Sequence, residues 1–94
     1  MFEARLTDGN RVLLSGRLDA SQAEQLRSVL DTVKESCIVD FSELQYISSA
    51  GLGMLLATQK RLGESGHSLK LVNLNPRIRD IFLVAGFNFV FKIE

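Results

Sequence analysis

Two adjacent serines, Ser48 and Ser49, stand where a short apolar segment gives way to a helical pattern, and Ala50 and Gly51 follow them. A serine at such a junction can cap the helix by accepting a hydrogen bond from a free backbone N–H, which contributes about 1 kcal/mol. It can also accept a phosphoryl group, because the unpaired amides and the positive end of the helix dipole favour an anion there. Phosphorylation adds about −1.5 to −2 charges at pH 7 and so changes the surface that a partner meets. Both interpretations stay open from these residues alone.

A catalytic serine is a weaker interpretation. Serine hydrolases need a nucleophile, a base and an orienting acid, and the stretch Ser48-Ser49-Ala50-Gly51 does not match the G-x-S-x-G nucleophile elbow. His67 is the only histidine and lies in a Gly/Ser-rich segment after the predicted helix. We therefore predict that the protein is not an enzyme.

Nucleotide and metal sites find little support. Gly51-Leu52-Gly53 lacks the third glycine of the dinucleotide fingerprint, since Leu56 stands there, and the P-loop lysine and serine are missing. Small residues instead let the backbone turn tightly and the new helix pack against the sheet. The scattered acids Asp19, Asp40 and Glu43 are interpreted as caps or solvated side chains rather than metal ligands. We predict no cofactor and no metal.

Composition indicates one globular domain over residues 1–94, since 46% of the residues are hydrophobic and 23% charged. Lys plus Arg and Asp plus Glu each number 11, so no bulk field attracts nucleic acid or an anionic membrane. Cys37 is the one cysteine and cannot form an internal disulfide. Residues Met1–Arg5 do not begin a signal peptide, and no apolar run approaches the ~20 residues of a membrane span. We expect a cytoplasmic protein without membrane insertion.

The chain pattern predicts an α/β fold in the order β-β-α-β-α-β-α-β, with a mainly parallel sheet that begins with an antiparallel hairpin. A turn at Asp8-Gly9-Asn10 joins the first two strands, and Leu44 and Ile47 are expected to anchor a connecting segment over 42–47. The first helix starts at a capping box of either Ser21 with Glu24 or Asp19 with Gln22. We predict strands over 2–7, 11–15, 37–41, 69–74 and 89–93, and helices over 20–34, 50–64 and from Asn75-Pro76 to a left-handed cap at Gly86.

Three stretches carry a resemblance to a known family: Ser15–Ala20, Val39–Gly53, and Leu71–Pro76 with Ile78–Gly86. The family that they resemble is the STAS domain family, the bacterial anti-sigma factor antagonists. Ser15–Ala20 resembles the G-x-L-D element before the first helix of the family. Val39–Gly53 resembles the D-x-S-x-L-x-x-I-(D/S)-S-(S/T/A)-G-L-x stretch. Leu71–Pro76 and Ile78–Gly86 resemble the strand, N-P helix start and closing helix. The resemblance covers nearly the whole chain and implies a single STAS domain.

The resemblance implies partner switching. In that family, a serine at the position of Ser49 is phosphorylated by an anti-sigma factor that is also a serine kinase, of the GHKL ATPase type. The unphosphorylated domain binds this kinase and frees a sigma factor, and a PP2C-type phosphatase reverses the modification. The resemblance also implies that Asp19 lies near Ser49, and that the partner-binding surface comprises Asp19, Ser48, Ala50, Gly51, Leu52 and Met54.

Two features depart from the family pattern. Many phosphorylated members have Asp where this chain has Ser48, which makes Ser48 a rival acceptor. The sequence given ends at Lys92-Ile93-Glu94, without the further C-terminal helix that many members carry, and self-association as a homodimer stays open. The alternative function is a STAS subunit of a larger assembly, such as a lipid-transport or stressosome-like complex, that is never phosphorylated.

Overall fold

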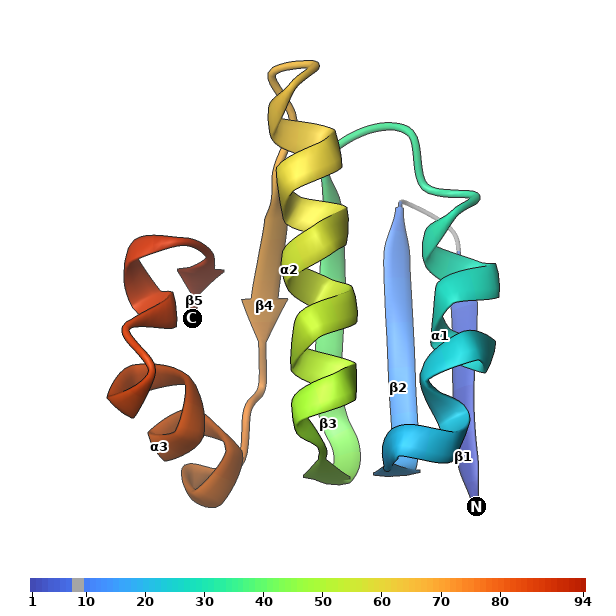
Figure 1. The fold of residues 1–94 in the computed structure, drawn as a ribbon, viewed down its shortest axis with the longest axis vertical. Coiled ribbons are helices and arrows are strands. Elements are labelled where there is room, and N and C mark those ends of the chain that lie inside the picture. The colour runs from blue at the N-terminus through green and yellow to red at the C-terminus, as the bar shows by residue number, and fades with distance from the viewer. Residues whose placement is uncertain (8–9) are drawn as a thin grey trace.

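The computed structural model describes residues 1–7 and 10–94 and has the predicted order of strands and helices (Figure 1). The strands are β1 (Phe2–Thr7), β2 (Arg11–Leu18), β3 (Cys37–Ile47), β4 (Leu69–Val72) and β5 (Lys92–Ile93). The helices are α1 (Ala23–Leu30), α2 (Ser49–Gly63) and α3 (Pro76–Val84), with short 3-10 helices at η1 (Ala20–Gln22) and η2 (Phe87–Phe89).

The five strands form one sheet in the order β1-β2-β3-β4-β5. β1 and β2 are antiparallel, and every later neighbour is parallel, as the sequence predicted. Each parallel step moves one strand further in the same direction, and such crossovers are right-handed. All three helices therefore lie on one face of the sheet (Figure 1).

The core fills the space between this face and the helices. Alternate residues of β2 and β3 point into it, and Leu26 and Leu30 of α1 and Leu55 and Leu62 of α2 close it from above. Phe82 of α3 packs edge-on against Phe41 of β3, with ring centroids 5.8 Å apart. The strand residues of this core include Val12, Leu14, Val39, Phe41, Leu69 and Leu71.

Five predicted boundaries are wrong. One is that of β4, which ends at Val72 rather than at Leu74. β3 continues through Ser42–Ile47, which the sequence analysis assigned to a connecting segment, and β2 continues to Leu18. Leu44 and Ile47 are buried as expected, but as strand residues. α1 ends at Leu30 rather than Lys34, because hydrogen bonds of the 3-10 type take over, from Thr32 N to Val29 O (3.1 Å) and from Val33 N to Leu30 O (3.0 Å). The last strand is only Lys92–Ile93, because η2 occupies the segment around Phe89.

Both predicted caps of the third helix are present in the structure. Asn75 caps α3 by accepting a hydrogen bond from Ile78 N (2.9 Å), and Gly86 is left-handed at φ 76°. Asp19 caps η1, so the second of the two proposed starts is the one nearer the structure. In the predicted turn, Asp8 and Gly9 lie outside the described residues, while Asn10 has φ 59°. Among the described residues, no helix has the length and apolar character that crossing a bilayer requires.

Candidate functional site

Ser48 is the N-cap of α2. Its extended backbone (φ −88°, ψ 168°) places its Oγ to accept a hydrogen bond from Gly51 N, 3.2 Å away. Its own carbonyl accepts from Leu52 N at 3.0 Å, which begins the hydrogen-bond ladder of the helix. The side chain is half-buried. The hydroxyl of Ser48 therefore has a structural use.

Ser49 is the first residue of α2, and its side chain is exposed. Within the described parts of the chain, its hydroxyl makes no hydrogen bond. The backbone amides of the first helical turn have no partner within the helix, so this end carries positive potential. The predicted acceptor Ser49 and its rival Ser48 thus differ in the structure: the Ser48 hydroxyl caps the helix, and the Ser49 side chain is exposed.

The turn after β2 lies beside this helix start. Ser48 N donates to Leu18 O at 2.8 Å, and Leu18 pairs with Ile47 across the strands. Asp19 follows Leu18 directly, so the turn that carries Asp19 adjoins the strand end that contacts the start of α2. The carboxylate of Asp19 accepts from the hydroxyl and N–H of Ser21 (2.7 and 3.1 Å), and the hydroxyl contact is the main cause that lowers the pKa of Asp19.

The other predicted surface residues differ in accessibility. Ala50 is exposed, whereas Leu52 and Met54 are half-buried and pack partly against the core. Gly51 is buried, and a Cβ there would stand 2.8 Å from the Leu18 side chain. Gly51 is therefore a packing residue that lets α2 approach β2, and it adds no exposed side chain to the predicted docking surface.

The sequence analysis missed two residues at this end of the sheet. Arg17 and Tyr46 are cross-strand partners one residue before Leu18 and Ile47, and the Arg17 guanidinium lies over the Tyr46 ring, 4.5 Å from its centroid. Tyr46 is 39% exposed, so a cation and an aromatic face are both accessible here. The strand that carries Tyr46 was predicted as a loop, which hid this pairing.

The structure does not bring His67 to Ser49. His67 follows the carboxyl end of α2, and Ser49 starts its amino end, so the fifteen-residue helix separates them by roughly 20 Å. The ring Nδ1 of His67 lies 3.3 Å from Ser36 Oγ instead. No imidazole is in place to act as a base for the Ser49 hydroxyl.

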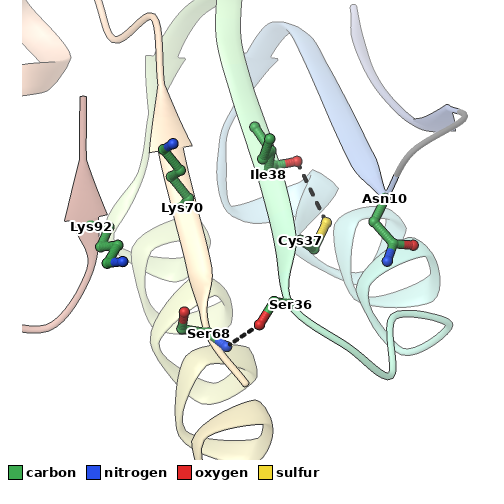
Figure 2. A pocket seen from close by; sticks show the side chains of 7 residues that line it. All are labelled: Asn10, Ser36, Cys37, Ile38, Ser68, Lys70 and Lys92. Carbon is green, nitrogen blue, oxygen red and sulfur yellow. Dashed lines mark hydrogen bonds between the residues drawn. The ribbon is translucent and has the colours of Figure 1, made fainter. Parts of the chain in front are cut away.

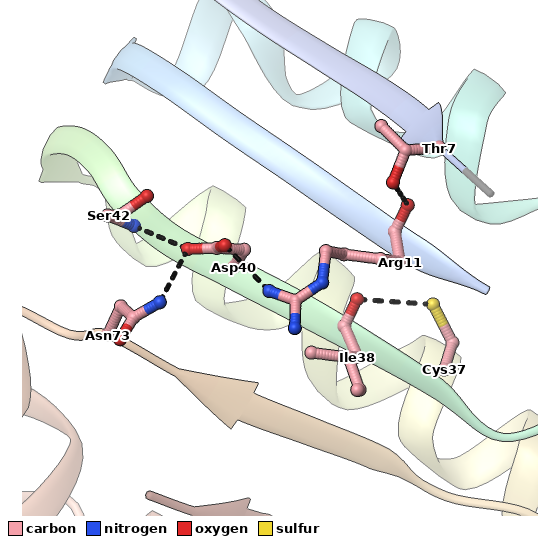
Figure 3. Close-up of polar contacts among 7 residues, drawn as sticks. All are labelled: Thr7, Arg11, Cys37, Ile38, Asp40, Ser42 and Asn73. Carbon is pink, nitrogen blue, oxygen red and sulfur yellow. Dashed lines mark hydrogen bonds and ion pairs between the residues drawn. The ribbon is translucent and has the colours of Figure 1, made fainter. Parts of the chain in front are cut away.

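Asp40 is buried rather than solvated, which corrects the expectation for this acid. On the sheet face opposite the helices, its carboxylate accepts from Arg11 Nη1 (2.7 Å), Ser42 N (2.9 Å) and Asn73 Nδ2 (3.1 Å) (Figure 3). Burial by itself would raise the pKa of Asp40, but these hydrogen bonds outweigh it and lower the pKa below its ordinary value. Through this one carboxylate the cluster joins β2, β3 and the residue that follows β4.

A pocket of about 360 Å³ lies at the amino ends of β3 and β4 (Figure 2). Ser49 follows the carboxyl end of β3, at the other end of that strand. Lys70, one of its two lysines, is already paired with Glu94 at 2.8 Å. In the described chain, no group of three or more His, Cys, Asp or Glu side chains could hold a metal ion. The pocket is lined by Asn10, Ser36, Cys37, Ile38, Ser68, Lys70 and Lys92.

A five-stranded sheet covered on one face, with a free serine at the start of the helix after the long central strand, defines a STAS-type α/β domain. The chain belongs to this family: the family described as "Mlab, STAS domain" matches residues 2–92. BtrV of Bordetella bronchiseptica is 34% identical over 84 residues, which are 85% of this chain and 72% of BtrV. The anti-sigma-B factor antagonist of Bacillus subtilis is 33% identical over 90 residues, 89% of this chain and 80% of that protein.

Solved structures show the same fold. An anti-sigma factor antagonist from Mycobacterium paratuberculosis has a TM-score of 0.82 at 24% identity, covering 99% of this chain and 83% of that one. The anti-sigma factor antagonist SpoIIAA in its unphosphorylated form has a TM-score of 0.74 at 24% identity, covering 100% and 87%.

Proposed function

We propose that this chain is an anti-sigma factor antagonist that binds an anti-sigma factor while the Ser49 hydroxyl is free and releases it when Ser49 is phosphorylated. The observation that carries the proposal is the difference between the serines: Ser49 is exposed and unbonded, and Ser48 is engaged as the cap. Relatives named anti-sigma factor antagonists support the partner class. SpoIIAA, similar in fold, has been solved in a phosphorylated form.

The partner surface we propose surrounds this helix start. It comprises Asp19, Ser49 and Ala50, with the outer parts of Ser48, Leu52 and Met54. The Arg17–Tyr46 pair lies at the same end of the sheet, one residue before Leu18 and Ile47. A phosphate on Ser49 would face the helix amides, so it can be added without unfolding α2. Its charge would meet an apolar or acidic partner site at a cost in desolvation and repulsion, which is the basis of the switch.

The proposed switch needs two enzymes that act on Ser49. We propose a kinase of the GHKL ATPase type that is itself the anti-sigma factor, and a PP2C-type phosphatase for the reverse step. In this scheme the domain itself supplies no catalysis, and His67, the one imidazole of the sequence, lies roughly 20 Å from Ser49.

The test is to recover the protein from its native cells, measure its intact mass and locate any phosphate by fragmentation. The matched variants are Ser48→Asp, which keeps a capping oxygen but removes the rival hydroxyl, and Ser49→Ala. We expect one added phosphate on the wild type and on Ser48→Asp, and none on Ser49→Ala. Phosphate on Ser48 would refute the residue assignment, and an unmodified protein under all growth and stress conditions would favour the assembly subunit.

Binding supplies the second half of the test. In pulldowns of the anti-sigma factor, Ser49→Ala is expected to bind as the unmodified wild type does, and Ser49→Asp to bind more weakly, because it places a negative charge on the proposed surface. Equal binding of both variants would contradict the switch, even if Ser49 were found phosphorylated.

A further inference from the structure

The edge strand β1 presents unpaired backbone groups. β1 is the first strand in the sheet order, and in the described chain no other strand pairs with its outer side. Ile38 N donates to Asn10 O at 2.9 Å. The backbone N–H and C=O groups of the even-numbered residues at the start of β2 therefore point toward β3, and those of the odd-numbered residues point toward β1. Thr7 pairs with Arg11. The odd-numbered residues of β1 therefore bond to β2, and the N–H and C=O groups of Phe2, Ala4 and Leu6 point outward.

The side chains of β1 are self-complementary. Glu3 and Arg5 lie on the sheet face without helices, about 60% exposed, with Arg5 Nε 3.5 Å from Glu3 Oε1. On the helix face, Leu6 is 49% exposed although it is apolar. Exposed edge strands tend to pair with another strand unless charge, proline or a bulge prevents it. Here the two charges are of opposite sign and symmetric about Ala4.

We propose that β1 pairs antiparallel with β1 of a second copy, about a two-fold axis at Ala4. In this register Glu3 lies opposite Arg5 of the second copy, and Arg5 lies opposite its Glu3, so both cross-strand pairs attract. Shifting the register to place the axis at Glu3 or at Arg5 would set like charges against each other. Ala4 then faces Ala4, and both are outward residues that can exchange two backbone hydrogen bonds.

The same register buries apolar surface on the helix face. Leu6 comes to lie opposite Phe2 of the second copy and loses its exposure to water. One existing contact must be exchanged, because Phe2 O accepts from Gln25 Nε2 at 3.2 Å. This exchange and the small contact area make a weak dimer, at the low end of specific interfaces.

The dimer leaves the proposed switch accessible. Antiparallel edge pairing keeps both helix layers on the same face of one continuous sheet, and it points the starts of the two α2 helices toward opposite ends. Neither Ser49 lies at the interface. The inference therefore does not depend on the proposed function and is tested without any partner protein.

The test uses opposite charge changes. Sedimentation equilibrium from about 10 μM to about 1 mM is expected to show a monomer–dimer equilibrium for the wild type. Glu3→Arg and Arg5→Glu are each expected to weaken dimerisation by about tenfold or more, since both pairs become like-charged. An equimolar mixture of the two variants restores both attractive pairs and is expected to dimerise as well as the wild type. The control is Arg79→Glu, an exposed change on α3.

Three results of these measurements would contradict the proposed dimer. A wild type that stays monomeric at 1 mM, a mixture that does not recover, or a control as weak as the edge variants would overturn the proposal. Amide hydrogen exchange checks the register, because the N–H groups of Ala4 and Leu6 are expected to gain protection as the dimer forms. The N–H groups of Glu3 and Arg5 bond to β2 and serve as the internal reference. Unchanged exchange at Ala4 in a dimeric sample would place the interface elsewhere.

Discussion

Replacing Ser48 by Ala tests whether Ser48, rather than Ser49, caps α2. The change removes the Oγ that accepts from Gly51 N at 3.2 Å and leaves that half-buried amide without its side-chain partner. Loss of such a cap costs about 1 kcal/mol, within a range of about 0.5–2. For a domain of this size, each kcal/mol lowers the melting temperature by about 4–8 °C. Ser49→Ala removes an exposed, unbonded hydroxyl and should change the free energy of unfolding by less than about 0.5 kcal/mol.

The assay is urea unfolding followed by far-UV circular dichroism, since the chain has no tryptophan. A third variant, Ser48→Asp, is expected to keep nearly wild-type stability, because Asp caps as well as Ser and its charge suits a helix N-terminus. The expected order is therefore wild type, Ser49→Ala and Ser48→Asp together, with Ser48→Ala clearly below them. Equal losses for the two alanine variants would refute the assignment of the cap to Ser48.

Three further outcomes follow from packing and charge. Gly53→Ala should stabilise α2 by about 0.5–1 kcal/mol because the site is open, whereas Gly51→Ala should destabilise the domain by collision with Leu18; the free energies of unfolding decide both. The pKa of Asp40 is lower in the folded state than in the unfolded state, so ionised Asp40 stabilises the fold at pH values above the ordinary carboxyl pKa. This stabilisation is lost as the pH falls through the pKa of the folded state. Between pH 5 and pH 2, the free energy of unfolding should therefore fall less in Asp40→Asn than in the wild type. Burial raises the pKa of Cys37, so a thiol reagent should react slowly with native protein and rapidly in urea; equal rates would contradict this.

The fold class was predictable from the sequence because local signals agreed with the tertiary structure. The caps at Asn75 and Gly86, the β-branched segment at Cys37–Phe41 and the helical spacing of leucines all indicated the observed elements. The segment 42–47 failed because its buried residues, Leu44 and Ile47, are three apart rather than two. Register shifts between β2 and β3 produce this spacing, and a single sequence gives no sign of them.

The candidate site was predictable in position but not in detail. The residues alone left open which serine caps the helix, since its first residue is uncertain by one position, and only the family resemblance favoured Ser49 as the acceptor. Gly51 was placed on the surface because a small residue allows access as well as close packing, and only the position of Leu18 decides between them. The third helix shows the same limit: Ile78 and Phe82 are buried, but Ile81, an apolar residue of the same helix, is 38% exposed.

The rigid start of α2 has a consequence for any enzyme that modifies it. Ser49 is already part of the helix. Ser48 before it is held by the hydrogen bond that its Oγ accepts from Gly51 N and by the one that its own N–H donates to Leu18 O. An enzyme cannot draw this serine into a cleft as an extended peptide without breaking both contacts. Its specificity must therefore be for the folded shape around the helix end, and a short peptide carrying the same residues would be a poor substrate.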